Sequence, residues 1–164
     1  MLAVVNGRPI LLSEVETVEA VRDLAREAAV DALIDEHLMF REAARLPVAA
    51  ASATATVEDV EIRKLLATHA AVAGRVAEAD LRRLVHRQLV ILKYVEVRFL
   101  PQVRVGDDVV REAFETEYSG RADAPSLADA TEGLRQRLVR KDLDARIESW
   151  VKELRAAAQI RYNR

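Results

Sequence analysis

Residues 4–16 read VVNGRPILLSEVE, and this stretch predicts a β-hairpin that leads directly into a helix. The Asn6-Gly7 pair lies between two apolar stretches, and this dipeptide readily adopts the positive φ angles of a type I′ turn. Residues 2–5 should therefore pair with residues 8–11. Pro9 cannot donate a hydrogen bond to a neighbouring strand, so we expect it on an edge strand or facing outward.

A single hairpin is only marginally stable in water, so a third strand is expected. The best candidate is the segment 158–162 near the other end of the chain, where apolar and polar residues alternate. The sequence therefore predicts a small antiparallel sheet that the N-terminal hairpin and the C-terminal strand build together.

The remainder of the chain favours helix, because it is rich in Ala, Leu, Arg and Glu and poor in Gly and Pro. We expect a mainly α fold with three recognisable caps: Ser13 with Glu16, Thr56 with Asp59, and Ser126 with Asp129. Residues 47–56 and 70–76 are expected to be a loop and a turn. The helices are expected at about 14–26, in the stretch that ends near 46, from 56 to about 69, at 77–100, in a short segment from 107 or 108, and over roughly 30 residues from 126.

The predicted helix at 77–100 is the most apolar part of the chain. One stripe consists of Leu81, Leu84, Val85, Leu89, Leu92, Val95 and Phe99, and Val90, Ile91, Tyr94 and Val97 widen it. This surface is either buried on several sides or partly open as a groove for an extended apolar peptide, and burial is the default. If the groove exists, its candidate peptide-binding residues are Val90, Tyr94 and Val97.

The composition argues against several classes of function. The chain has 25 Lys and Arg against 27 Asp and Glu, a net charge of -2, so no positive electrostatic field that would attract nucleic acid is expected. Only 4% of the residues are aromatic, so surfaces on which bases could stack are not expected either. Cysteine is absent, which excludes thiol chemistry. Lys93, Glu96 and Arg98 interrupt the most apolar stretch, so no integral membrane segment is expected.

Catalytic, metal and cofactor sites are also not expected. His37, His69 and His86 fall on different predicted helices and lack paired ligand spacing, so no metal site is expected. His37 lies on an apolar face and is interpreted as a hydrogen-bonded core or boundary residue. Adjacent acidic residues, such as Asp107 and Asp108, suit a helix N-terminus better than acid–base catalysis. The sequence also lacks a phosphate-binding loop and a nucleophile elbow.

Three segments together resemble the SurA family of periplasmic chaperones. They are VVNGRPILLSEVE at 4–16, ALIDEHLMFREAARL at 32–46, and LRRLVHRQLVILKYVEVRF at 81–99 followed by VRVGDDVVREAFE at 103–115. The resemblance implies a holdase-type chaperone that binds unfolded polypeptides, such as outer-membrane protein precursors, through an apolar cleft. The chain does not open with an export signal, so the expected periplasmic location follows from the resemblance alone.

The resemblance also implies a domain organisation. In the family, parvulin-type prolyl isomerase domains are typically inserted before the C-terminal helix, whereas here that junction is only the linker 119–125. We therefore expect a single core over 1–164, made of residues 1–118, the linker and residues 126–164, and no enzymatic activity. Two alternatives stay open: residual prolyl isomerase activity, and an assembly module that forms a homodimer by exchanging terminal elements.

Overall fold

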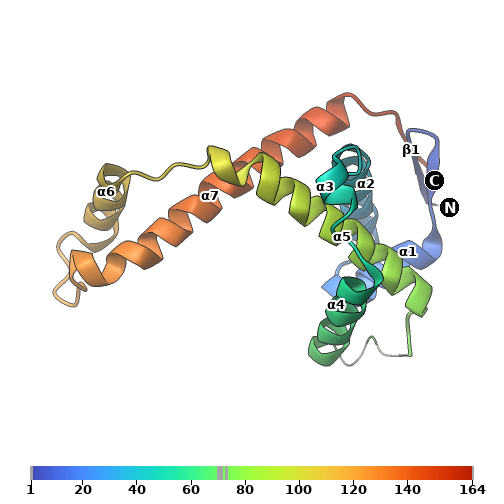
Figure 1. Cartoon of the computed structure of the whole chain (residues 1–164), viewed down its shortest axis with the longest axis horizontal. Coiled ribbons are helices and arrows are strands. Elements are labelled where there is room, and N and C mark those ends of the chain that lie inside the picture. Colours follow the sequence, from blue (N-terminus) through green and yellow to red (C-terminus); the bar gives the residue numbers. More distant parts are fainter. Residues whose placement is uncertain (1, 70–71, 73, 164) are drawn as a thin grey trace. The chain divides into compact units, whose positions relative to one another are not determined.

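The computed structural model of the chain describes residues 2–69, 72 and 74–163. These residues form seven α-helices and a three-stranded antiparallel sheet, which confirms the mainly α fold (Figure 1). In chain order the elements are β1 Ala3–Val5, β2 Arg8–Ile10, α1 Leu12–Arg22, α2 Arg26–Ala43, α3 Pro47–Ala50, α4 Ala55–Thr68, α5 Glu78–Arg98, the 3-10 turn η2 Leu100–Gln102, α6 Asp107–Tyr118, α7 Leu127–Ala156 and β3 Ile160–Tyr162. None of these helices has the length and apolar character needed to cross a membrane.

The sheet has the strand order β2-β1-β3, which confirms both the hairpin and the third strand. Asn6 and Gly7 have φ angles of 50° and 81°, as the predicted turn requires. Pro9 lies opposite Val4 on the edge strand β2, where its missing N–H costs no ladder hydrogen bond. Asn6 also ties the turn to the segment before β3, because its amide donates to Gln159 O and its Oδ1 accepts from Gln159 N, both at 2.9 Å.

The first helix differs from its prediction at both ends. It begins at Leu12, and the Glu14 carboxylate accepts the Leu11 amide at 3.2 Å, so the capping box predicted for Ser13 and Glu16 is wrong. The helix ends at Arg22 because Asp23 adopts the left-handed conformation, with φ of 51°. A second helix, α2, then starts at Arg26.

The Ala-rich stretch expected to be a loop contains the short helix α3, with Pro47 in its first turn, where a missing N–H is tolerated. The next helix, α4, is capped by Thr54, whose hydroxyl accepts the Val57 amide at 3.4 Å, and not by Thr56. Ser126 accepts the Asp129 amide at 3.2 Å, which confirms the cap predicted for α7. In the turn predicted at 70–76, residues 70, 71 and 73 lie outside the described residues.

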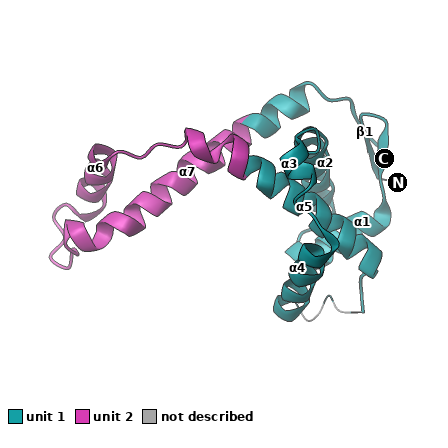
Figure 2. Ribbon diagram, viewed as in Figure 1, with its two compact units in different colours: residues 1–95, 150–164 teal, residues 96–149 magenta. Residues whose placement is uncertain are grey.

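The chain divides into two compact units (Figure 2): unit 1, Met1–Val95 with Trp150–Arg164, and unit 2, Glu96–Ser149. In unit 2, Val110 of α6 and Leu134 of α7 are buried, and Arg137 pairs with Glu117 at 2.6 Å. The stretch 119–125, predicted as the linker at which the SurA family would carry an inserted domain, joins α6 to α7 inside this unit.

Unit 1 holds a core to which the sheet and helices α1, α2 and α5 contribute. Its buried members are Ala3, Val5, Ile10, Val15, Val18, Val21, Ala29, Val30, Leu33, Ile34, Leu38, Val72, Leu81 and Leu84. On α5 the buried side follows Leu84, Arg87, Ile91 and Val95, whereas Leu92, predicted to belong to the apolar stripe, is 64% exposed. A charged residue therefore occupies a position in the buried stripe of α5.

Candidate functional site

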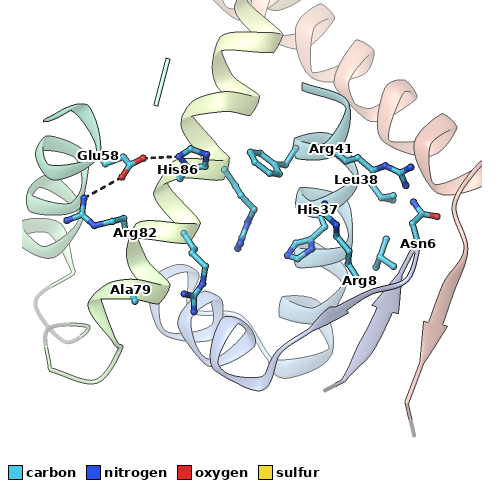
Figure 3. A pocket seen from close by; sticks show the side chains of 13 residues that line it. Asn6, Arg8, His37, Leu38, Arg41, Glu58, Ala79, Arg82 and His86 are labelled. Atoms are coloured by element: carbon cyan, nitrogen blue, oxygen red, sulfur yellow. Dashed lines mark hydrogen bonds and ion pairs between the residues drawn. The ribbon is translucent and has the colours of Figure 1, made fainter. Parts of the chain in front are cut away.

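A pocket of about 700 Å³ opens in unit 1 between the hairpin, α2, α4 and α5 (Figure 3). A volume of this size is typical of sites that bind ligands. Its lining combines apolar side chains with several cationic ones: Val5, Asn6, Arg8, His37, Leu38, Phe40, Arg41, Glu58, Ala79, Arg82, Arg83, His86 and Arg87.

A buried ion network holds α1, α2 and α5 together beside this pocket. Arg87 of α5 donates from Nε to Glu36 Oε1 at 2.7 Å and from Nη1 to Glu14 Oε1 at 2.9 Å. Arg22 closes the network by donating to the second oxygen of Glu36 at 2.5 Å. Because two carboxylates face two guanidinium groups, the network is neutral, as burial requires.

The position of Glu14 changes its acidity. Burial alone would raise its pKa, but His37, the Leu11 amide and the charge of Arg87 outweigh that effect and lower the pKa to about 2. His37 Nε2 lies 3.5 Å from Glu14 Oε1, at the outer limit of hydrogen-bonding distance, so His37 acts on this carboxylate through a long contact. The hydrogen-bonded state predicted for His37 is not seen at Nε2, which is buried without a well-formed hydrogen bond. Glu14 is therefore ionised at neutral pH. Its negative charge holds the guanidinium group of Arg87, which lines the pocket.

On the opposite side of the pocket, Glu58 of α4 holds two residues of α5. Its carboxylate lies 2.8 Å from His86 Nδ1 and accepts from Arg82 at 3.4 Å, as Figure 3 shows. Arg82 also pairs with Asp59 at 2.8 Å and with Glu78 at 3.2 Å, so acidic partners surround this guanidinium group. These contacts connect α4 to α5 and leave Arg82 little capacity for another anion.

Two other arginines that line the pocket are not neutralised in this way. Arg8 lies on the hairpin and Arg41 lies on α2. Both are across the pocket from α5 (Figure 3). Both side chains are exposed. Neither forms an ion pair with another residue that the structure describes. Each therefore offers five N–H donors in a fixed planar arrangement to a ligand.

An apolar surface accompanies these cations. Val5 and Leu38 are buried members of the core that reach the pocket, and the Phe40 ring meets the His86 ring edge-on at 5.7 Å. The pocket can therefore contact apolar groups and an anionic group of the same ligand.

The residues predicted to bind peptide lie elsewhere. Val90 is 1% exposed, and the ring of Tyr94 stacks on Trp150 at 5.0 Å. Val97 is 42% exposed and belongs to unit 2, and none of the three lines the pocket. Their role in binding peptide stays a prediction.

Among the histidines, His37 and His86 line the pocket, whereas His69 caps the end of α4. Across the part of the chain that the structure describes, no group of three His, Asp or Glu residues is arranged to hold a metal ion. The sequence did not lead us to predict that arginines line a pocket. A signal was present on one helix, because Arg82, Arg83, His86 and Arg87 lie on the same side and could have indicated a basic face.

Comparison of the chain with protein-family models, with curated proteins and with solved structures gives no match. Membership in the SurA family is therefore not shown, and the resemblance stays a prediction.

Proposed function

We propose that the chain binds segments of unfolded polypeptide, as a holdase-type chaperone does, and that the pocket of unit 1 accepts the segment. The observation that carries this proposal is the combination of about 700 Å³ of open volume with both apolar and guanidinium side chains in the lining. The resemblance to the SurA family adds the proposal that the clients are outer-membrane protein precursors in the periplasm.

An unfolded segment presents chemistry that complements this lining. Its backbone carbonyl groups accept hydrogen bonds from guanidinium donors whatever the sequence, and its apolar side chains can contact Val5, Leu38 and Phe40. Such contacts tolerate many sequences, as a chaperone requires. We expect an affinity near micromolar, or about 8 kcal/mol, because tighter binding would retain the client.

One substitution can reduce the volume of the pocket. Ala79 is exposed on the first turn of α5 and lines the pocket, so Ala79→Trp should fill part of it without removing a charge. Ala67→Trp is the matched control, because Ala67 is an exposed alanine of α4 that does not line this pocket. Both variants should retain the helical content and unfolding midpoint of the wild type.

Two measurements test the proposal. Isothermal titration calorimetry measures binding of an unlabelled, unstructured peptide that is acetylated, amidated and free of charged residues. Light scattering measures suppression of aggregation of heat-unfolded citrate synthase. We expect the wild type and Ala67→Trp to bind and suppress, and Ala79→Trp to lose about tenfold in affinity. If Ala79→Trp behaves as the wild type, the pocket is not the binding site; if no protein binds or suppresses, the chaperone proposal fails.

The two alternative functions predict different results. A prolyl isomerase would accelerate crossing of the barrier of ~18–20 kcal/mol in an Xaa-Pro peptide, which a protease-coupled assay detects. An assembly module would form a stable dimer in sedimentation experiments yet fail to suppress aggregation. Our proposal predicts neither turnover of the Xaa-Pro peptide nor dependence of suppression on dimer formation.

A further inference from the structure

We propose that Arg8 and Arg41 form a carboxylate-binding subsite, so that this pocket prefers polypeptide segments that carry a carboxylate group. The inference rests on the proposed peptide binding and specifies its substrate class. The carboxylate can belong to an Asp or Glu side chain or to the C-terminus of the segment.

The distribution of charge around the pocket supports this assignment. Five arginines line the pocket, against one glutamate. Three of them already have partners: Arg87 binds Glu14 and Glu36, Arg82 binds three carboxylates, and Arg83 contacts Asp80. Arg8 and Arg41 are the two arginines of the lining that have no acidic partner among the described residues.

The placement of these two arginines suits binding. Arg8 lies opposite Val5 in the β1–β2 register, directly after the turn, so the hairpin fixes its backbone. Arg41 follows His37 by one helical turn on α2, a helix anchored in the core by Leu33, Ile34 and Leu38. Two rigid elements therefore present guanidinium groups to one volume, and only the side chains must be ordered when the ligand binds.

The kind of anion follows from the guanidinium group and from the rest of the lining. A guanidinium group binds a planar carboxylate through two parallel hydrogen bonds, and such charge-assisted bonds are about twice as strong as neutral ones. Val5, Leu38 and Phe40 beside the arginines offer apolar contacts to the chain that carries the carboxylate, which a free inorganic anion could not use. We expect one carboxylate to tighten binding about tenfold at low salt, and less at high salt because the arginines are exposed.

The experiment compares three unlabelled peptides by isothermal titration calorimetry at low salt. The first is the neutral peptide of the preceding section, the second carries one central Glu in place of Gln, and the third is neutral but ends in a free carboxylate. The proteins are the wild type, Arg8→Gln, Arg41→Gln and the double variant. Arg161→Gln is the control, because Arg161 is exposed on β3, does not line the pocket and has no ion pair in the described chain.

We expect the wild type and Arg161→Gln to bind at least one carboxylate peptide about tenfold more tightly than the neutral peptide. In the double variant this gain should disappear, so that the carboxylate peptides and the neutral peptide bind equally. All three peptides should also lose the hydrogen bonds that the two guanidinium groups donate to backbone carbonyl groups. Arg8→Lys with Arg41→Lys should keep part of the gain, because the charge remains and the paired hydrogen bonds do not. The Glu peptide and the free C-terminus reveal which source of carboxylate is preferred.

The outcomes separate this inference from the proposed function. If the neutral peptide binds but a carboxylate adds nothing, or if the double variant keeps the full gain, the subsite is refuted and peptide binding stands. If no peptide binds the wild type, both proposals are refuted. Because both arginines are exposed, the substitutions should leave the unfolding midpoint unchanged, which circular dichroism verifies.

Discussion

Arg87 on α5 donates from Nε to Oε1 of Glu36 on α2 at 2.7 Å, and both side chains are buried. The same guanidinium group reaches Glu14 on α1, so one residue bridges carboxylates from two other helices, and Arg22 supplies the second positive charge. A buried carboxylate is tolerated only when such a partner compensates its charge. The contact therefore specifies how α1, α2 and α5 fit together next to the pocket.

Arg87→Ala should destabilise the protein by about 3–5 kcal/mol, because it leaves Glu14 and Glu36 buried with half of their compensating charge. Urea unfolding followed by circular dichroism measures this change. Arg161→Ala removes an exposed arginine from β3 and should cost less than about 0.5 kcal/mol. A loss below about 1 kcal/mol for Arg87→Ala would show that the network adds little to folding.

The acidity of Glu14 predicts a pH dependence of stability. Its pKa falls from 4.5 to about 2 on folding, so the ionised side chain contributes its full stability above pH 4.5 and loses it as the pH falls toward 2. The contribution is on the order of 3 kcal/mol at neutral pH. The free energies of unfolding of the wild type and Glu14→Gln should therefore differ most at pH 7 and converge near pH 2.

Urea unfolding of both proteins between pH 7 and pH 2 measures this difference. Glu16→Gln, which removes an exposed carboxylate from the same helix, controls for the loss of one negative charge. A difference between the wild type and Glu14→Gln that stays constant over this range would contradict the assignment.

Local signals in the sequence were sufficient for the sheet and for most of the helices. Asn6-Gly7 dictates its turn through backbone conformation alone, and the alternation around Ile160 marks a strand independently of its partner. Helix boundaries were harder, because Ser, Thr and Asp occur in several adjacent positions that could each cap. Asp23 shows the difficulty, since its left-handed conformation ends α1 where the apolar pattern continues.

The site could not be predicted from the sequence, because long-range pairing creates it. Arginine is rarely buried without a partner, and the partners of Arg87 lie 51 and 73 residues away in the chain. A helical stripe defined by aliphatic residues therefore excluded Arg87 and included Leu92, which faces solvent. Arg8 and Arg41 share a pocket only because the hairpin and α2 fold together.

The structure caps α4 with Thr54, whereas the sequence predicted Thr56 as the cap, and two substitutions distinguish these positions. Thr54→Ala should lower stability by about 1 kcal/mol, because it removes the acceptor for the Val57 amide. Thr56→Ala should have little effect or stabilise slightly, since Thr56 is an exposed residue inside the helix and Ala has the higher helix propensity. Equal unfolding midpoints for the two variants, or a larger loss for Thr56→Ala, would favour the start predicted from sequence.

A pair of leucines on α5 tests which face of the helix is buried. Leu84→Ala should cost about 2–5 kcal/mol, because Leu84 is 1% exposed and its truncation leaves a cavity. Leu92→Ala should cost less than about 0.5 kcal/mol, because that side chain is 64% exposed. Thermal and urea unfolding of the two variants measure these losses, and similar values would mean that the aliphatic stripe predicted from sequence is buried after all.

Substitution of Glu58 should change the affinity for carboxylate peptides in the opposite direction to substitution of Arg8 and Arg41. It is the acidic residue of the pocket lining, and Glu58→Gln removes one negative charge while keeping the shape of the side chain. Carboxylate-bearing peptides should then bind the variant a few-fold more tightly, a gain of roughly 0.5–1 kcal/mol at low salt, while the neutral peptide binds unchanged. Calorimetry at low and high salt measures the effect, and Asp129→Asn on α7 of unit 2 matches the charge change outside the pocket. An equal gain for the neutral peptide would point to a change of pocket shape, and no gain for any peptide would mean that the field in the pocket does not select carboxylates.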